Sequence, residues 1–184
     1  LTPRSARQKV IGLVPQDIGL YGHMTARENL TVFAQMMGAA RRSRDTAVDD
    51  ALHRVGLTER AHTRVDALSG GMKRRINVAA AIMHKPPLLI MDEPTAGVDV
   101  AARDAVHTLA RDLAASGICV LLVTHELEQA ESVCDQLLVL SKGRLLAAAP
   151  PDELLAQCYK GQREVTVRLV SAPGETVQNH LRGL

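Results

Sequence analysis

Two acidic residues stand directly after a short apolar run, at the point where a buried strand would end. Residues 88–91 are continuously apolar, and Asp92 and Glu93 follow them. The first carboxylate can hold a magnesium ion through its water shell, and the second can take a proton from an attacking water. The pair therefore suits nucleotide hydrolysis, although a single Asp-Glu pair is more often a helix cap or a solvated turn.

A serine and two glycines precede a stretch with helical spacing. Ser69 can donate a hydroxyl, while Gly70 and Gly71 let main-chain amides approach a phosphate closely. The positive end of a helix dipole favours an anion at the same place. The basic residues 73–75 follow in the first turns of this helix, where positive charges interact unfavourably with the dipole. Exposure to solvent, or acidic groups on a partner, would offset this unfavourable interaction. The turn is a candidate phosphate contact, and the alternative is a serine N-cap with a flexible entry.

Two further polar residues follow apolar runs that have the character of strands. His125 comes shortly after the run 118–123, and Gln16 comes shortly after the run 11–14. A histidine in such a place can bond to a terminal phosphate or orient a water. A glutamine can reach a metal ion or a water. Neither residue is informative alone, because a lone histidine is more often structural.

The elements that would position these residues alternate between strands and helices. Short apolar runs that end in polar residues predict parallel strands buried on both faces, with the chemistry at their carboxyl edge. Apolar residues at helical spacing predict the helices between them. The predicted helices are one from a capping box at Thr25–Glu28 to Gly38, one through Val48–Val55, one after Ser69 through Met83, and one through Val106–Leu113.

The C-terminal part of the chain has a different character. Residues 137–146 predict a strand-turn-strand hairpin. The prolines at 150–151 predict a chain break and then a short helix through Leu155. Beyond Tyr159 the composition shifts. The expected boundaries are 1–159 for one domain, about 24–85 for a helical subdomain within it, and 160–184 for the start of a C-terminal appendage domain.

Composition excludes several classes of function. Hydrophobic residues make up 46% of the 184 residues and charged residues 23%, a balance that a disordered chain does not have. A net charge of +2 and an aromatic content of 2% argue against nucleic acid as a partner, since such sites need positive fields or stacking faces. The three cysteines lack a paired spacing, which favours a reducing cytosol. No apolar run approaches the roughly 20 residues of a membrane span.

Taken together, the motifs resemble those of the ATP-binding cassette (ABC) ATPases in order and spacing. The matching segments are 14–16 (Q-loop), 68–75 (LSGGMKRR, signature), 88–95 (LLIMDEPT, Walker B), 96–99 (D-loop) and 123–125 (H-loop). The resemblance covers about residues 8–157. It implies an α/β fold, namely the core of a P-loop NTPase-like ABC ATPase with a helical insert.

The resemblance implies catalytic and metal-binding roles for four residues. Glu93 would be the general base, and Asp92 would be the carboxylate on the magnesium side. His125 would contact the γ-phosphate. Gln16 would sense the metal and couple the site to a membrane subunit. The implied ligands are ATP and Mg²⁺.

Four other residues would act across a dimer, again by resemblance. Ser69, Gly70 and Gly71 would clamp an ATP held by the opposing subunit. Asp99 would cross the dimer interface. A homodimer of ATPase subunits is therefore expected.

The chain also departs from the family's pattern. Met72 stands where many members have glutamine, and with the basic run 73–75 it resembles ATPases of ABC-2-type exporters, including the daunorubicin-resistance group. No Gly-Lys dipeptide occurs, so the sequence has no G-x-x-x-x-G-K-[ST] loop (Walker A). In the family this loop and an aromatic adenine-stacking residue precede the Q-loop. We therefore expect an N-terminally truncated chain, lacking the N-terminal strands and inactive as an ATPase by itself.

The function implied is that of the ATP-binding subunit of an ABC exporter. Two copies would enclose two ATP molecules and drive a separate integral membrane permease, with the subunit peripheral on the cytoplasmic face of the cell membrane. The alternatives are a soluble ABC ATPase of translation or DNA repair, and a remnant that dimerises without hydrolysis. A co-purifying permease separates the first from the second, and ATP turnover separates both from the third.

Overall fold

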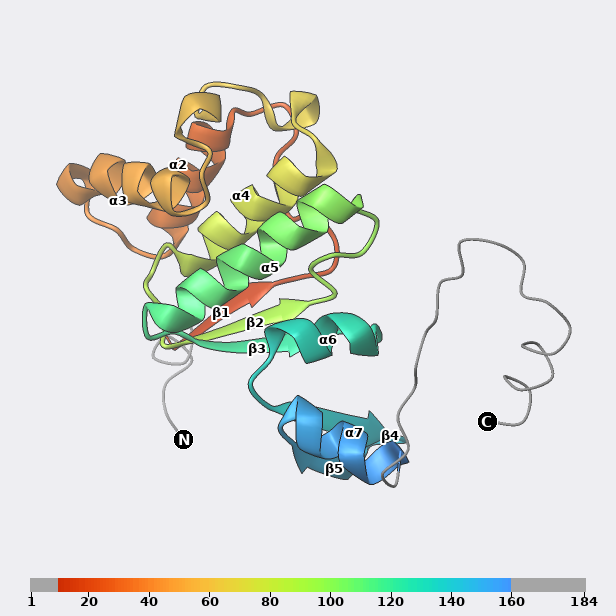
Figure 1. The fold of residues 1–184 in the computed structure, drawn as a ribbon. Coiled ribbons are helices and arrows are strands. Elements are labelled where there is room, and N and C mark those ends of the chain that lie inside the picture. The colour runs from red at the N-terminus through yellow and green to blue at the C-terminus, as the bar shows by residue number, and fades with distance from the viewer. Residues whose placement is uncertain (1–9, 160–184) are drawn as a thin grey trace, which may run out of the picture. The chain divides into compact units, whose positions relative to one another are not determined.

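The computed structural model describes residues 10–159 of the chain (Figure 1). The chain divides into two compact units, Leu1–Cys134 and Asp135–Leu184. All of the candidate site residues lie in the first unit. The predicted appendage at 160–184 lies outside the described residues, and the domain boundary at 159 stays a prediction.

Three parallel strands form the sheet of the first unit, in the order β1-β2-β3. They are β1 (Ile11–Val14), β2 (Leu88–Asp92) and β3 (Cys119–Val123). Val14 lies opposite Met91, and Asp92 lies opposite Val123, so the three strands end at one edge. The alternation of short apolar strands with helices is confirmed. The residues that follow the strands therefore emerge side by side.

Helices connect these strands, and one further helix follows β3. They are α2 (Ala26–Met36), α3 (Arg41–Arg54), α4 (Gly70–Ile82), α5 (Val100–Ala115) and α6 (Leu127–Val133), with short 3-10 helices at Thr58–Arg60 and Val65–Ala67. The predicted capping box opens α2, because Thr25 Oγ1 accepts from the Glu28 amide at 3.2 Å and Glu28 Oε2 accepts from the Thr25 amide at 2.7 Å. The Thr25 hydroxyl also donates to Glu28 Oε2, at 3.0 Å, and the bonds that this carboxylate accepts from the Thr25 amide and hydroxyl lower the pKa of Glu28. The 3-10 helices and α6 are too short for a periodic pattern and were not predicted.

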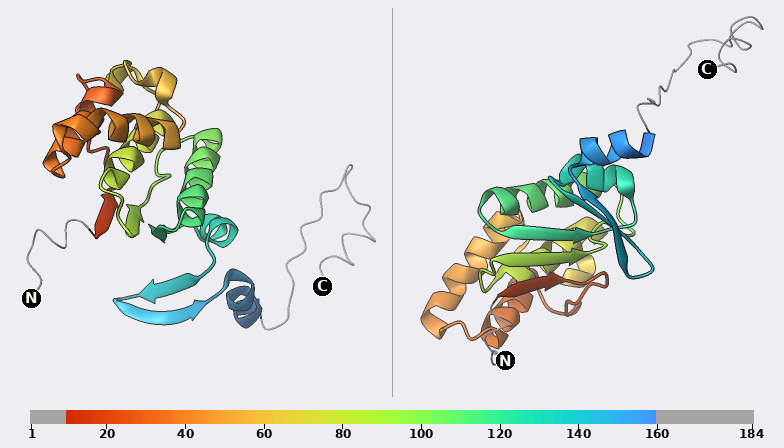
Figure 2. Two further views of the ribbon diagram at one scale, coloured as in Figure 1. Left: turned by 90° about the vertical axis from the view of Figure 1, so that its left-hand side faces the viewer. Right: turned by 90° about the horizontal axis from the view of Figure 1, so that it is seen from below.

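One face of the sheet packs against α4 and α5, and the other does not (Figures 1 and 2). Leu89 and Met91 on the packed face are completely buried, whereas Leu13 and Val123 are 57% and 45% exposed. The prediction of strands buried on both faces is therefore wrong for one face in the described residues. The reason is topological. The strands follow sequence order in the sheet, an order in which crossovers of one hand place their helices on the same side.

The second unit contains an antiparallel hairpin and a helix. Strands β4 (Leu137–Ser141) and β5 (Arg144–Ala149) are joined through Lys142 and Gly143, which both have positive φ values, 48° and 74°. Two left-handed central residues are what a two-residue hairpin turn needs, so the predicted hairpin is confirmed. Helix α7 (Pro151–Tyr159) starts at the predicted proline but is longer than predicted.

Candidate functional site

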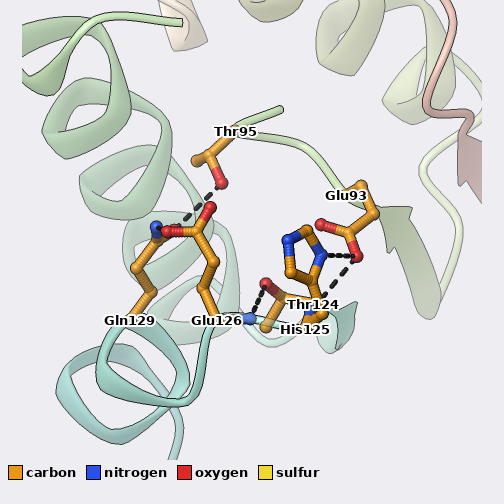
Figure 3. A network of polar contacts seen from close by, with 6 residues as sticks. All are labelled: Glu93, Thr95, Thr124, His125, Glu126 and Gln129. Atoms are coloured by element: carbon orange, nitrogen blue, oxygen red, sulfur yellow. Dashed lines mark hydrogen bonds and ion pairs between the residues drawn. The ribbon is translucent and has the colours of Figure 1, made fainter. Parts of the chain in front are cut away.

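Glu93 and His125 meet at the carboxyl edge of the sheet (Figure 3). Glu93 Oε1 lies 2.7 Å from His125 Nδ1 and accepts the main-chain N–H of His125 at 3.1 Å. An ionised carboxylate can only accept, so Nδ1 carries the proton and donates it. The Glu93 amide in turn donates to Val123 O at 2.9 Å, which fixes the end of β2 against β3. The two strand ends thus hold one carboxylate and one imidazole together.

The backbone at Glu93 is in an uncommon conformation. Its φ is +44°, in the left-handed region that residues other than glycine rarely adopt. Such a conformation costs on the order of 1 kcal/mol or more and persists only where surrounding contacts maintain it. Here those contacts are the bonds to Val123 and His125. The turn directs the Glu93 carboxylate toward β3, where the side chain is only 16% exposed.

The imidazole of His125, in contrast to the Glu93 side chain, is 80% exposed. The hydrogen bond to Glu93, and then the negative charge of Glu93, raise the pKa of His125. The ring therefore carries its positive charge to higher pH than an unpaired histidine. Its second nitrogen, Nε2, lies on the side away from Glu93 (Figure 3). The pair can thus offer a base and a cationic donor to one ligand.

A second set of polar contacts joins residues that neighbour this pair in the sequence (Figure 3). Thr95 Oγ1 donates to Gln129 Oε1 at 3.0 Å, and both residues are buried. Gln129 Nε2 donates to Glu126, whose amide donates to Thr124 Oγ1 at 3.0 Å (Figure 3). Arg103 Nη1 approaches Glu126 at 3.7 Å. Sequence reasoning missed Gln129, since nothing in a seven-residue helix marks it as buried.

The signature serine and the D-loop aspartate each cap a helix. Ser69 Oγ accepts the Met72 amide at 3.3 Å at the start of α4. Asp99 Oδ1 accepts the Ala102 amide at 2.9 Å at the start of α5. Ser69 is thus the N-cap of α4 in this structure. A contact of Ser69 with a phosphate stays a prediction. Ser69 and Asp99 both remain exposed.

The starts of α4 and α5 lie against each other through Gly71. A Cβ atom at Gly71 would lie 2.4 Å from Ala102 Cβ, closer than real Cβ atoms approach. A Cβ at Gly70 would lie 3.9 Å from Val98 Cγ1, an ordinary contact. Only the second of the two glycines is therefore required by packing. The first stays available for another role.

We expect Gly71→Ala to lower the free energy of unfolding by about 1–3 kcal/mol, because α4 and α5 must separate to admit the methyl group. Gly70→Ala is the matched control and should change it by less than about 0.5 kcal/mol. Denaturant unfolding of the two variants measures the difference. Equal effects of both substitutions would show that the close approach of α4 and α5 is not required.

The structure assembles the candidate residues in two groups. Glu93 and His125 are in contact, with Asp92 half-buried beside them as the last residue of β2. Gln16 is exposed and follows β1 at the same edge. The second group contains the signature turn and Asp99 at the starts of α4 and α5. Within residues 10–159 the structure does not bring the two groups into one contact network.

One expectation about the basic run is corrected. A solvated face, or acidic groups on a partner, was expected to accommodate residues 73–75. Arg74 is instead 4% exposed and donates to two main-chain carbonyls of the Q-loop, those of Pro15 and Gln16. Helical spacing places Arg74 beside buried positions of α4, which is the signal that sequence reasoning passed over.

Comparisons with known proteins identify the family and the fold of the chain. Residues 2–96 match the family model described as ABC transporter. The chain is 41% identical over 152 residues to the linearmycin resistance ATP-binding protein LnrL of Bacillus subtilis (strain 168), covering 83% of this chain and 49% of that protein. It is 44% identical over 152 residues to the Nod factor export ATP-binding protein I of Bradyrhizobium diazoefficiens, with the same coverage. The chain thus spans about half the length of these curated relatives.

A solved structure shares the fold. The chain matches cbiO1 from Clostridium perfringens, described as part of the ABC transporter complex cbiONQ, with a TM-score of 0.75. The match covers 96% of this chain and 68% of that one at 24% identity, a likeness that concerns the fold alone. The α/β ABC ATPase fold inferred from the motifs is therefore confirmed. With more than half of its residues matched by the family model, the chain belongs to the ABC transporter family and carries part of its ATP-binding domain.

Proposed function

We propose that the protein is the ATP-binding subunit of an ABC exporter. ATP binding and hydrolysis between two copies would drive export of a substrate through a separate permease. The observation that carries the proposal is the contact between Glu93 and His125 at the carboxyl edge of the sheet. The names of two relatives, a linearmycin resistance protein and a Nod factor export protein, support the exporter class.

In this proposal Glu93 is the general base of ATP hydrolysis. Its Oε1 is occupied by two donors from His125, so Oε2 is the atom left to take the proton. Water attacks the γ-phosphorus, the bond to the β-phosphate oxygen breaks, and the proton of the water passes to Oε2. His125 would donate from Nε2 to the γ-phosphate in its protonated form, which its raised pKa favours. Holding the base by two bonds orients it before the reaction starts.

The oxygen donors at the sheet edge fit a magnesium ion. Asp92 supplies a half-buried carboxylate and Gln16 an exposed side-chain amide. Within residues 10–159 no group of three or more His, Cys, Asp or Glu side chains could hold a metal. Mg²⁺ suits such a sparse set, because it keeps several waters and takes other ligands from substrate phosphates. When bound, the ion would neutralise charge on the β- and γ-phosphates.

The second group of residues would serve the opposing subunit. We propose that Ser69, Gly70 and Gly71 contact the partner's ATP and that Asp99 lies at the dimer interface. The exposed start of α4 supports this, since its amides and dipole favour an anion. The 184 residues contain no Gly-Lys phosphate loop. We therefore infer that this chain by itself does not complete an ATPase cycle.

The permease would contact the segment that follows the Q-loop. Tyr21 is 46% exposed, while its main chain is anchored on α2. Buried Asn29 accepts the Tyr21 amide at 2.8 Å and donates to Tyr21 O at 3.0 Å. The loop thus presents an aromatic side chain on a fixed backbone, as a docking surface requires. In the described residues no helix is long and apolar enough to span a bilayer.

Cysteine crosslinking in membranes tests the exporter function. In the protein expressed from its complete gene, with native cysteines replaced by serine, we expect Asp17→Cys and Tyr21→Cys to capture a permease. Asp112→Cys on the exposed side of α5 is the control and should capture none. Capture from Asp112 alone would contradict the proposed surface. ATP turnover with no captured membrane protein would favour the soluble alternative.

A further inference from the structure

Arg74 is a buried cation held by main-chain carbonyls. Its side chain lies on α4 and is 4% exposed. One nitrogen, Nη1, donates to Pro15 O at 3.0 Å and to Gln16 O at 2.7 Å. These contacts join positions 58 and 59 residues apart in the sequence. They connect the signature helix to Pro15 and Gln16 of the Q-loop.

The charge of Arg74 is poorly compensated for a buried group. Burial lowers the pKa of Arg74, and the negative charge of Asp17 acts in the other direction. Among the described residues the ion pairs do not include Arg74, and its Nε is buried without a hydrogen-bond partner. Removing a cation from water is unfavourable unless it is fully paired, and a protein with an apolar side chain of similar length at such a position is often no less stable. Stability alone therefore does not account for an arginine here.

The geometry suggests what the arginine adds. Its helix begins with the signature turn, Ser69 to Gly71, so a shift of α4 moves that turn as well. Main-chain hydrogen bonds also hold the segment that follows the Q-loop against the segment just before the signature. The Asp66 amide donates to Gly22 O at 3.0 Å, and the Val65 amide donates to Met24 O at 2.9 Å. Arg74 adds a side-chain contact to these main-chain bonds, and its contact is the one with Gln16.

We propose that Arg74 is a positioning residue that couples the Q-loop of one ATP site to the signature turn of the other. The inference rests on the proposed function, in which Gln16 serves the subunit's own nucleotide and Ser69 serves the partner's. A displacement of the Gln16 main chain is transmitted through the guanidinium to α4 and so to the second site. Binding at one site therefore changes the affinity of the other, which appears as cooperativity.

The test is the ATP dependence of turnover by the protein expressed from its complete gene. The parent should show a Hill coefficient above about 1, and Arg74→Met should bring it to about 1. Arg74→Lys keeps a cationic donor and should give an intermediate value. Arg75→Met is the matched control, because Arg75 donates to Val55 O at 3.0 Å within the helical subdomain. It should leave the Hill coefficient unchanged.

Thermal unfolding separates coupling from loss of structure. Arg74→Met should unfold no more than a few degrees below the parent, because it removes a buried charge. If it does not fold, Arg74→Lys decides the question. A folded Arg74 variant that keeps the parent's Hill coefficient would overturn the inference, as would a parent without cooperativity or an equal loss in Arg75→Met. A parent that does not hydrolyse ATP would instead overturn the proposed function, and the inference with it.

Discussion

Replacing Glu93 with glutamine should lower ATP turnover by about 10²–10⁴-fold, the range that a positioned general base contributes. Glutamine keeps the length of the side chain, and its amide oxygen can accept both bonds from His125. It cannot take a proton from water at neutral pH. ATP binding should persist, because the substitution leaves the donors to phosphate in place.

Phosphate release at saturating ATP measures this effect in the protein expressed from its complete gene. Glu131→Gln, on the exposed side of α6, is the control and should stay within about twofold of the parent. Turnover of Glu93→Gln within threefold of the parent would exclude Glu93 as the base. Loss of ATP binding in the same variant would point to a structural role for its strained turn.

Replacing His125 with alanine should reduce turnover by about 10²–10³-fold, the usual effect of removing one preorganised donor. The substitution removes the proposed γ-phosphate contact and also the side-chain bond that orients Glu93 Oε1. His62→Ala, at an exposed position of the helical subdomain, should change turnover by less than about twofold.

The two residues should also behave as a unit. Because Glu93 and His125 are in contact, the losses in a double variant should fall far short of additive. We expect Glu93→Gln/His125→Ala to lose no more than about tenfold beyond the worse single variant. Fully additive losses would mean that the 2.7 Å contact has no part in catalysis.

The sequence predicts the helices and strands well because local patterns determine where they lie. The apolar runs mark β2 and β3 and so the positions of Glu93 and His125. The capping box at Thr25 and the serine at 69 mark the starts of α2 and α4 within one residue. Parallel pairing of the strands then brings the residues at their ends to one edge. The pairing of Glu93 with His125 follows from that register rather than from either motif alone.

Other features depend on tertiary contacts that no local pattern encodes. The positive φ of Glu93 is maintained by bonds to Val123 and His125, which are distant in the sequence. Arg74 occupies a buried position although its residue type and basic neighbours favour a surface. The exposure of the sheet face that carries Leu13 and Val123 depends on which side of the sheet the connecting helices pack against.

The central claim is that the two groups of residues act on ATP from opposite subunits. Light scattering, combined with a count of the bound nucleotides, tests this claim most directly in the Glu93→Gln variant. This variant should bind ATP without hydrolysing it. We expect a monomer without nucleotide, and with MgATP a dimer that holds two ATP molecules. Adding Ser69→Arg should keep the protein monomeric while ATP stays bound. An ATP-loaded Glu93→Gln that remains monomeric, or a dimer that persists with Ser69→Arg, would contradict the account.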